Sequence, residues 1–305
     1  MSKEILVSLC IPTNGILEWV LPVLESIYNQ SVDRDLFEVI VTDNGTNTDF
    51  KKQMQLYSTL YENMIYKETT AVQFQNQIEA FKLASGQLIK FVNHRMIFKE
   101  GALQHIIDIV RKNKKNMTPI YFSNGVLGCN KVIKYDSFDM YIKRLSYWSS
   151  WSAGTAIWKE QFRKLDLNKN FNSLFPHTDI LFLERHMSEY LIDDYPIMQE
   201  LIIDESKKGQ YDIFFAFAVE FPSLILELFR TGDIHLETFE YVLKNNRKFI
   251  AELYFKYCIK KEKCSYILSG YNDAIQIYYS KWEINKEILI KVTKSIIGKI
   301  RLLRK

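Results

Sequence analysis

The stretch Ile5-Leu6-Val7-Ser8-Leu9-Cys10-Ile11, followed by the turn Pro12-Thr13-Asn14-Gly15, decides the fold. The run before the turn is compact and apolar, which is typical of a parallel strand that is covered on both faces. The turn residues then end the strand abruptly. A chain that opens in this way predicts a sheet with helices packed on both of its sides.

The same alternation of strand and helix continues through the first two-thirds of the chain. Further strands are predicted at residues 37–42, 64–66, 88–92, 120–123 and 126–128. Helices are predicted from Val20 to Ile27, at 53–62, 74–84 and 101–112, and from Asp179 onward through Ile180, Leu183, Met187 and Leu191. Short strands that alternate with helices predict βαβ units, a mostly parallel sheet and an α/β fold.

Two local features refine the predicted helices. Pro22 fits a helix only in its first turn, so the first helix is expected to begin close to that residue. Gly86 suits a left-handed C-cap for the helix at 74–84. Beyond about Glu205 the patterns become long and helical, which predicts a first domain at residues 1–204 and a helical C-terminal region at 205–305.

Composition excludes several classes of protein. The chain has 305 residues, of which 47% are hydrophobic and 25% charged, as in soluble globular proteins. Its net charge of +4 is too small to imply nucleic-acid binding. The four cysteines form no metal-ligand spacing, which favours a reducing compartment and no structural zinc. No secretory signal and no apolar run of roughly 18–20 residues is found, so we expect a cytoplasmic protein.

The strand at 88–92 runs into three polar residues, Asn93-His94-Arg95, before an apolar pattern resumes at Met96. In open α/β sheets, ligands bind just beyond the carboxyl ends of the strands, so this triplet is expected at a ligand site. No acidic residue stands there to hold a metal. Neither G-x-G-x-x-G nor G-x-x-x-x-G-K-[ST] is present, which excludes the two common phosphate-binding loops.

Four pieces of the sequence, taken together, resemble the inverting family 2 glycosyltransferases of GT-A fold. They are Ser8-Leu9-Cys10-Ile11-Pro12-Thr13-Asn14, Val41-Thr42-Asp43-Asn44-Gly45-Thr46, Ala84-Ser85-Gly86 with the strand after it, and His177-Thr178-Asp179. The resemblance extends from about Ile5 to Tyr195. Asn76, ten residues before Gly86, resembles the abequosyltransferase-like branch of the family.

The resemblance implies a role for each matching residue. Pro12, Thr13 and Asn14 line the nucleotide pocket, Asn76 belongs to the nucleotide-sugar site, and Asp43 binds the base or ribose, which suits an acceptor-only carboxylate. Asp179 is the general base that deprotonates the acceptor hydroxyl, with Asp136 and Asp139 as weaker rivals. The donor is a nucleoside-diphosphate sugar, of UDP type, and the acceptor is a glycan or a lipid-linked glycan.

One departure from the family pattern falls on the triplet. The family usually carries D-x-D where this chain has Asn93-His94-Arg95, and those carboxylates bind Mg²⁺ or Mn²⁺. No metal cofactor is therefore expected here. Arg95, with Asn93 and His94 beside it, could bind the diphosphate instead, because a guanidinium makes charge-assisted bonds to phosphate and keeps its charge. The other outcome is a fold that binds without catalysis.

Each assignment has a structural alternative. Asp43 could cap its own turn, Asp179 could be a favourable charge at a helix N-terminus, and Arg95 could point into solvent. His177 is expected to be structural or to face the acceptor. The tryptophans at 148, 151 and 158 are expected in the core, with a sugar contact as the alternative.

The last 25 residues, Lys281 to Lys305, carry eight Lys or Arg and two Glu, a net charge of +6. Ile284, Ile288 and Val292 recur there at nearly helical spacing. Three interpretations remain open: a basic amphipathic helix on an anionic membrane, a helix packed on the protein, and a helix that forms a homo-oligomer.

The resemblance therefore implies an inverting glycosyltransferase of bacterial capsule, cell-wall or exopolysaccharide synthesis, which would be cytoplasmic or peripheral at the inner face of the membrane. The rival from another class is a non-catalytic nucleotide- or glycan-binding partner that regulates another transferase. A sugar nucleotidyltransferase ranks last, because the Gly-rich loop expected after its first strand is absent.

Overall fold

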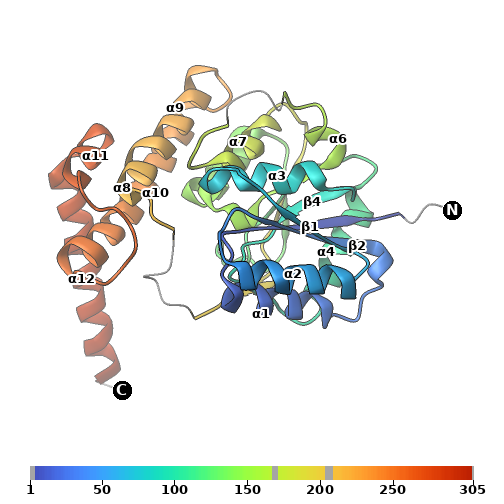
Figure 1. Cartoon of the computed structure of the whole chain (residues 1–305). Coiled ribbons are helices and arrows are strands. Elements are labelled where there is room, and N and C mark those ends of the chain that lie inside the picture. The colour runs from blue at the N-terminus through green and yellow to red at the C-terminus, as the bar shows by residue number, and fades with distance from the viewer. Residues whose placement is uncertain (1–3, 167–170, 203–208, 304–305) are drawn as a thin grey trace. The chain divides into compact units, whose positions relative to one another are not determined.

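The computed structural model describes residues 4–166, 171–202 and 209–303. The chain divides into two compact units, of which unit 1 comprises Met1–Tyr141 and Trp148–Ile202. Unit 2 comprises Ile142–Tyr147 and Ile203–Lys305. Unit 1 is an α/β fold and unit 2 is helical, so the predicted fold class is confirmed (Figure 1).

The central sheet of unit 1 has the strand order β3-β2-β1-β4-β8 among the described residues. Its strands are β1 (Val7–Thr13), β2 (Phe37–Asp43), β3 (Met64–Glu68), β4 (Leu88–Phe91) and β8 (Ala156–Trp158). The first four run parallel, and β8 pairs with β4 in the antiparallel direction. Because β1 lies between β2 and β4, the carboxyl ends of these three strands meet at one edge of the sheet.

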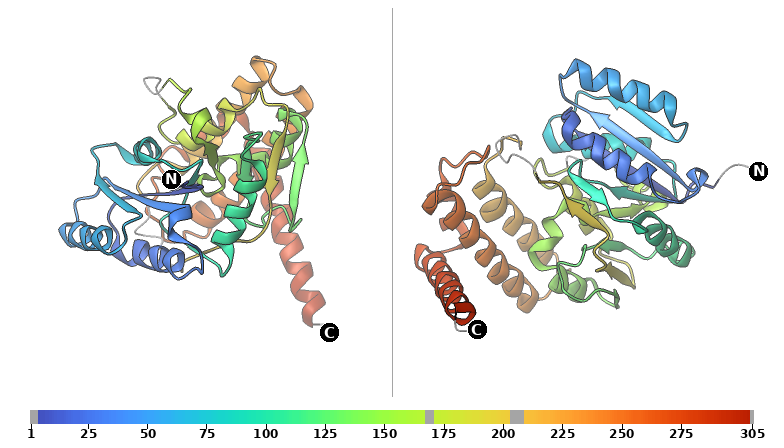
Figure 2. Two further views of the ribbon diagram at one scale, coloured as in Figure 1. Left: turned by 90° about the vertical axis from the view of Figure 1, so that its right-hand side faces the viewer. Right: turned by 90° about the horizontal axis from the view of Figure 1, so that it is seen from below.

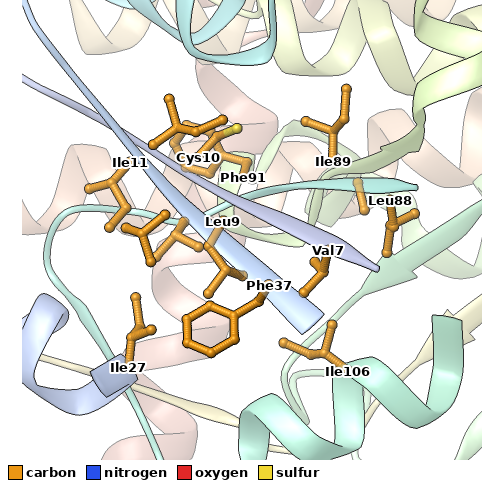
Figure 3. Close-up of a cluster of buried hydrophobic side chains, with 14 of the residues drawn as sticks. Val7, Leu9, Cys10, Ile11, Ile27, Phe37, Leu88, Ile89, Phe91 and Ile106 are labelled. Atoms are coloured by element: carbon orange, nitrogen blue, oxygen red, sulfur yellow. The ribbon is translucent and has the colours of Figure 1, made fainter. Parts of the chain in front are cut away.

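Helices cover both faces of this sheet (Figure 2). They are α1 (Leu17–Tyr28), α2 (Thr48–Leu60), α3 (Asn76–Leu83), α4 (Ala102–Asn113), α6 (Lys159–Phe162) and α7 (Pro176–Leu183). The helix α5 (Phe138–Leu145) instead places Phe138 and Tyr141 against Tyr190. Side chains of β1 alternate between the faces: the buried thiol of Cys10 donates to the Ala80 carbonyl oxygen of α3 at 3.6 Å. Leu9 points to the opposite face, where Ile27 of α1 and Ile106 of α4 lie (Figure 3).

Two smaller sheets complete unit 1. β5 (Met96–Phe98) pairs with β10 (Met198–Glu200) in the antiparallel direction. β6 (Ile120–Phe122), β7 (Val132–Tyr135) and β9 (Tyr190–Asp193) form the other sheet, with β9 in the middle. The short β5 begins directly after the triplet Asn93-His94-Arg95, so the triplet is a turn between two ordered strands, as the sequence pattern predicts.

Unit 2 contains the helices of the C-terminal region. They are α8 (Ile213–Phe215), α9 (Phe221–Arg230), α10 (Leu236–Leu253), α11 (Tyr271–Tyr278) and α12 (Lys281–Leu303). Two π-helical segments interrupt them, at Ala216–Glu220 and Tyr254–Ile259. Their core is rich in aromatic side chains, among them Phe214, Tyr257 and Tyr279. Within the described residues, no helix is both long enough and apolar enough to cross a bilayer.

The structure corrects the prediction for Pro22. It lies well inside α1, which begins at Leu17, and not in the first turn. The helix starts early because Gly15 ends the preceding turn with φ of +81°, and the N–H groups of Trp19 and Val20 already donate to the Ile16 carbonyl oxygen. The buried apolar face of α1 thus outweighs the hydrogen bond that proline cannot make.

Glycine is needed at position 86 for a different reason from the predicted left-handed C-cap. It has no positive φ, and α3 ends earlier, with extended backbone at Ala84. An added Cβ at Gly86 would lie 2.8 Å from the backbone nitrogen and the hydroxyl of Ser8. Glycine is therefore required by the close approach of this turn to β1.

Two further predictions on secondary structure are wrong. Residues 126–128 form a turn and not a strand, because the N–H groups of Leu127 and Cys129 donate to the carboxylate of Asp194. The helix after Asp179 ends at Leu183, and Leu191 lies on β9, where it pairs with Ile120. In both cases a tertiary partner overrides a local apolar pattern.

Gly86→Ala is expected to destabilise unit 1 by about 1–3 kcal/mol, because the new methyl group meets backbone that cannot move aside. Urea unfolding followed by circular dichroism measures this loss. Gly209→Ala is the matched control, since a Cβ there has no atom within 4 Å. Equal stability of the two variants would contradict the close-approach explanation.

Candidate active site

The residues predicted at the nucleotide pocket gather at the edge where β1, β2 and β4 end. Thr13 is the last residue of β1 and pairs with Asp43, the last residue of β2. The triplet Asn93-His94-Arg95 follows β4 after a single buried residue, Val92. Parallel pairing therefore brings these separate parts of the sequence to one place, as expected for a ligand site of an open α/β sheet.

Asn76, the first residue of α3, joins the ends of β1 and β2. Its buried side-chain amide donates to the carbonyl oxygens of Thr13 at 3.1 Å and Thr42 at 2.9 Å. Its Oδ1 accepts a hydrogen bond of 2.8 Å from the Thr69 hydroxyl. Both amide hydrogens are thus used inside the protein, and this geometry favours a bracing function over direct contact with a ligand.

Asp43 is buried and its two carboxylate oxygens are both engaged. Oδ1 accepts from the Gly45 N–H at 2.7 Å, and Oδ2 accepts from the Tyr66 hydroxyl at 3.2 Å. Burial raises the pKa of this carboxyl above its usual value, and the two hydrogen bonds partly oppose the rise. The first bond is the turn cap that the sequence left open as an alternative. A carboxylate oxygen can accept further bonds, so the nucleotide role of Asp43 stays a prediction.

His94 packs into the edge of the site. Its Nδ1 lies 2.9 Å from the hydroxyl oxygen of Thr13, and its ring meets Trp19 edge-on at 5.1 Å between centroids. Burial, with a smaller contribution from the adjacent Arg95, lowers the pKa of His94 to about 3. His94 is therefore neutral at physiological pH and adds no positive charge for a diphosphate.

Arg95 is held from two sides. The Oδ1 of Asn93 accepts from the Arg95 Nε at 3.3 Å and from its backbone N–H at 3.1 Å. The guanidinium carbon lies 5.6 Å from the ring centroid of Trp19, within the range of a cation–π contact. The two terminal nitrogens of Arg95 have no hydrogen-bond partner among the described residues.

Asp179 lies in the first turn of α7 and is linked to this edge by hydrogen bonds. Its Oδ2 accepts from the backbone N–H of Asn172 at 2.5 Å. The Asn172 carbonyl oxygen in turn accepts from the Gln75 side chain at 3.2 Å, and Gln75 directly precedes the brace Asn76. Asp136, the rival candidate for the general base, is exposed and directly follows β7, a strand of the three-stranded sheet.

The comparison with protein families shows which family this fold belongs to. The family "Glycosyl transferase family 2" matches residues 8–175, which is more than half of the chain. The chain belongs to glycosyl transferase family 2. The match begins in β1 and ends just before α7, so it contains every residue of the strand-end site described above.

Solved structures with the same fold share little sequence with this glycosyltransferase. S. aureus TarS 1-349 superposes with a TM-score of 0.58 at 14% identity, covering 83% of this chain and 74% of TarS 1-349. Its complex with UDP-GlcNAc gives the same score and identity over 90% of this chain and 80% of the other. The mannosyltransferase PcManGT from Pyrobaculum calidifontis, in complex with GDP-Man and Mn²⁺, gives 0.53 at 12% identity over 98% and 80%. No curated protein matches.

A divalent metal does not fit the triplet of this glycosyltransferase. Asn93 Oδ1, the one amide oxygen present, already accepts two N–H groups of Arg95. Arg95 is itself a cation, and His94 Nδ1 lies against Thr13. Among the described residues no group of three or more His, Cys, Asp or Glu could hold a metal ion. The donor set that carboxylates would supply for Mg²⁺ or Mn²⁺ is missing from this turn.

His177 and the tryptophans have mainly packing roles. His177 is buried, its Nε2 lies 2.8 Å from the Ser150 carbonyl oxygen, and burial lowers its pKa to about 4. Trp158 is buried and donates to the Thr118 carbonyl oxygen at 2.8 Å. Trp148 and Trp151 meet edge-on at 6.3 Å. The core interpretation holds for Trp158, and a sugar contact by either of the other two stays a prediction.

Sequence reasoning missed three residues that shape this site. Trp19 supports both His94 and Arg95, Tyr66 binds Asp43, and Gln75 connects the Asp179 side to α3. Trp19 could have been found only by its spacing, since it lies on the buried face of α1. The contacts of Tyr66 and Gln75 depend on tertiary structure, and no sequence signal marks them.

Lys90 is also unexpected, because it is a charged residue with 0% exposure inside β4. Its Nζ donates to the carbonyl oxygens of Phe91, at 2.9 Å, and of Ala153, and it lies 5.0 Å from the Phe122 ring centroid. Burial lowers its pKa to about 7. Lys90 thus ties the strand that precedes the triplet to the segment at 152–154.

Asn76→Leu is expected to lower the free energy of unfolding by at least about 2 kcal/mol, because the Thr69 hydroxyl and the strand-end carbonyl oxygens lose a buried partner. Urea unfolding measures the loss. Asn245→Leu is the control, because Asn245 is half-buried on α10 and its side chain bonds only Tyr241 and Lys248 of the same helix. If Asn76→Leu unfolds like the wild type and only nucleotide binding weakens, Asn76 contacts the ligand and does not act as a brace.

Proposed function

We propose that this protein transfers a sugar, with inversion, from a nucleoside-diphosphate donor to a hydroxyl group of a glycan or lipid-linked glycan. The strand-end edge formed by Thr13, Asp43 and the triplet holds the donor. Arg95 faces its diphosphate, and Asp179 activates the acceptor. The Asn76-based assignment to an abequosyltransferase-like branch is part of the same proposal, although its side chain is committed to the brace.

The observation that carries the proposal is which atoms of the Arg95 guanidinium have partners in the protein. One side of the guanidinium is fixed by Asn93 and Trp19, while its terminal nitrogens have no protein partner among the described residues. A guanidinium fixed in this way is ready to make two parallel, charge-assisted hydrogen bonds to phosphate oxygens. Its place beyond β4 is where the family usually has the acidic metal-binding motif.

The chemistry needs charge stabilisation more than any other contribution. In the proposed step the acceptor oxygen attacks the anomeric carbon from the face opposite the diphosphate. A C–O bond to the acceptor forms, the C–O bond to the diphosphate breaks, and the acceptor proton passes to the Asp179 carboxylate. The leaving diphosphate gains negative charge in this step, and a cation already in place stabilises it without reorganisation.

The donor base, the acceptor and the pathway belong to this proposal as well. A UDP donor is the first choice from the resemblance. The similar structures contain UDP-GlcNAc and GDP-Man, so both nucleotides belong in the donor panel. Synthesis of bacterial capsule, cell wall or exopolysaccharide is the proposed setting. The competing function is that of a non-catalytic partner that binds nucleotide or glycan. This alternative stays open because the acidic metal-binding motif is absent from the triplet.

Arg95→Ala is expected to lower kcat/KM by about 100-fold or more, because the leaving diphosphate loses its fixed cation. Arg95→Lys should recover part of this loss, since a lysine keeps the charge but not the two parallel bonds. Nucleotide release from UDP- and GDP-sugars in the presence of EDTA is the measurement. Arg111→Ala on α4 is the control for loss of one exposed arginine.

The same assay separates the alternatives. Wild-type turnover that disappears in EDTA would overturn the assignment of the diphosphate contact to Arg95. Nucleotide binding without turnover, across the whole donor panel and with added glycan acceptors, would favour the non-catalytic partner.

Asp179→Asn is expected to lower turnover by about 10²–10⁴-fold while leaving nucleotide affinity unchanged, because an amide cannot accept the acceptor proton. Turnover and calorimetric binding of UDP measure the two effects. Asp136→Asn and Asp139→Asn are the matched controls. A larger loss of turnover in either control than in Asp179→Asn would assign the base elsewhere.

A further inference from the structure

The inner side of α12 packs on the other helices of unit 2, which supports the interpretation of the tail as a helix packed on the protein. Ile284 is 3% exposed, and Ile288 is half-buried against the same aromatic core. The helix begins with a capping box, in which the Ser280 and Glu283 backbone N–H groups each donate to the other residue's side chain. The apolar stripe that the sequence offers to a membrane is therefore used inside the protein.

Both acidic residues of α12 are neutralised on that inner side. Arg247 of α10 pairs with Glu283, and its other terminal nitrogen lies 3.1 Å from a carboxylate oxygen of Glu287. Lys291 pairs with Glu252 at 2.7 Å. These ion pairs fix which face of α12 meets unit 2, and they leave no acidic residue of α12 on its outer face.

The outer face of α12 carries a different set of side chains. Trp282 is 68% exposed and Leu289 is 66% exposed, and seven residues, or about two helical turns, separate them. Lys286 lies between them, with its ammonium 5.0 Å from the Trp282 ring centroid. Lys281 is exposed at the start of the helix.

We propose that this outer face, defined by Lys281, Trp282, Lys286 and Leu289, is a docking surface for an anionic lipid bilayer. The partner is identified by charge and shape. An exposed tryptophan and leucine enter the boundary between headgroups and acyl chains, while lysines beside them meet lipid phosphates. The remaining basic residues of the tail, at 294, 299, 301, 304 and 305, strengthen the attraction of this end of the chain to an anionic surface.

The helix is also placed to reach such a surface. In Figure 1 and in the left view of Figure 2, the C-terminal part of α12 extends beyond the other helices of unit 2. A helix that lies in the bilayer surface needs one free face along its length, and it does not need the length or apolarity of a spanning segment. The proposal does not depend on catalysis, so it can fail or succeed independently of glycosyl transfer.

Flotation of the full chain with lipid vesicles tests the proposal. One vesicle type contains phosphatidylcholine alone, and in the other about a third of the lipid is phosphatidylglycerol. The wild type is expected to float with the anionic vesicles and to be released by high salt, which screens the lysines. Equal flotation with both vesicle types, or none with either, overturns the proposal.

Variants of the outer face locate the contact. Trp282→Ala combined with Leu289→Ser is expected to lower partitioning about ten-fold or more, because two apolar anchors are lost. Lys286→Glu is expected to lower it more than about five-fold. Leu236→Ser, which removes a 52% exposed leucine from α10, is the matched control and should float like the wild type. Thermal unfolding of all variants should be unchanged, since the altered side chains are exposed.

Two further measurements separate a bilayer from a second copy of the chain. Brominated acyl chains should quench part of the tryptophan fluorescence of the wild type, and Trp282→Phe should bind vesicles but lose that part of the quenching. Light scattering should give the same mass for the wild type and the double variant. A wild-type dimer that the double variant dissociates, without vesicle binding, would assign the face to self-association and overturn the proposal.

Discussion

The amide of Asn76 fixes the position of two strand ends, and the rest of the site is arranged around them. Its two N–H groups bind the carbonyl oxygens of Thr13 and Thr42, which belong to neighbouring strands. A buried amide with every hydrogen used is costly to disturb, because each lost bond leaves a polar group without water or protein. This makes the edge rigid before any ligand arrives. Thr13 then positions His94, and Asp43 is held at the end of β2 by Gly45 and Tyr66.

In the proposed mode of donor binding, the turn Asn93-His94-Arg95 meets the diphosphate with a cation of the chain itself. A carboxylate pair attracts a metal, and the metal brings the positive charge. Here the positive charge belongs to the chain itself, and Asn93 and Trp19 restrict its position. The electrostatic requirement of the leaving group is the same in both designs. A protein-borne cation needs no metal ligands at this turn.

The sequence predicts the four parallel strands of the central sheet well, because buried parallel strands are continuous apolar runs with turn residues behind them. It predicts the type and limits of an element poorly where a partner elsewhere in the chain decides them. Asp194 takes the N–H groups of residues 127 and 129, and β6 pairs with Leu191, so neither segment follows its local pattern. That the predicted site residues meet at one edge of the sheet was predictable for the same reason as the strands. Trp19, Tyr66 and Gln75 were not, since they act through contacts between distant segments. In α12 the spacing of Ile284 and Ile288 predicts one apolar face. Only the ion pairs of Arg247 show that this face packs against the other helices of unit 2.

The charges around β4 show how one cation can be kept available to a ligand. Lys90 is fully buried below the triplet, His94 is packed against Trp19, and Arg95 is half-buried at the edge. Positive charges repel strongly where little water screens them, and the group that can release its proton most easily becomes neutral. His94 does so, with a pKa of about 3 that burial and Arg95 both lower. Arg95 cannot, because a guanidinium stays charged throughout the physiological range. The neutral histidine therefore fills space beside a permanent cation, and in the proposed donor complex the charge that Arg95 presents does not vary with pH.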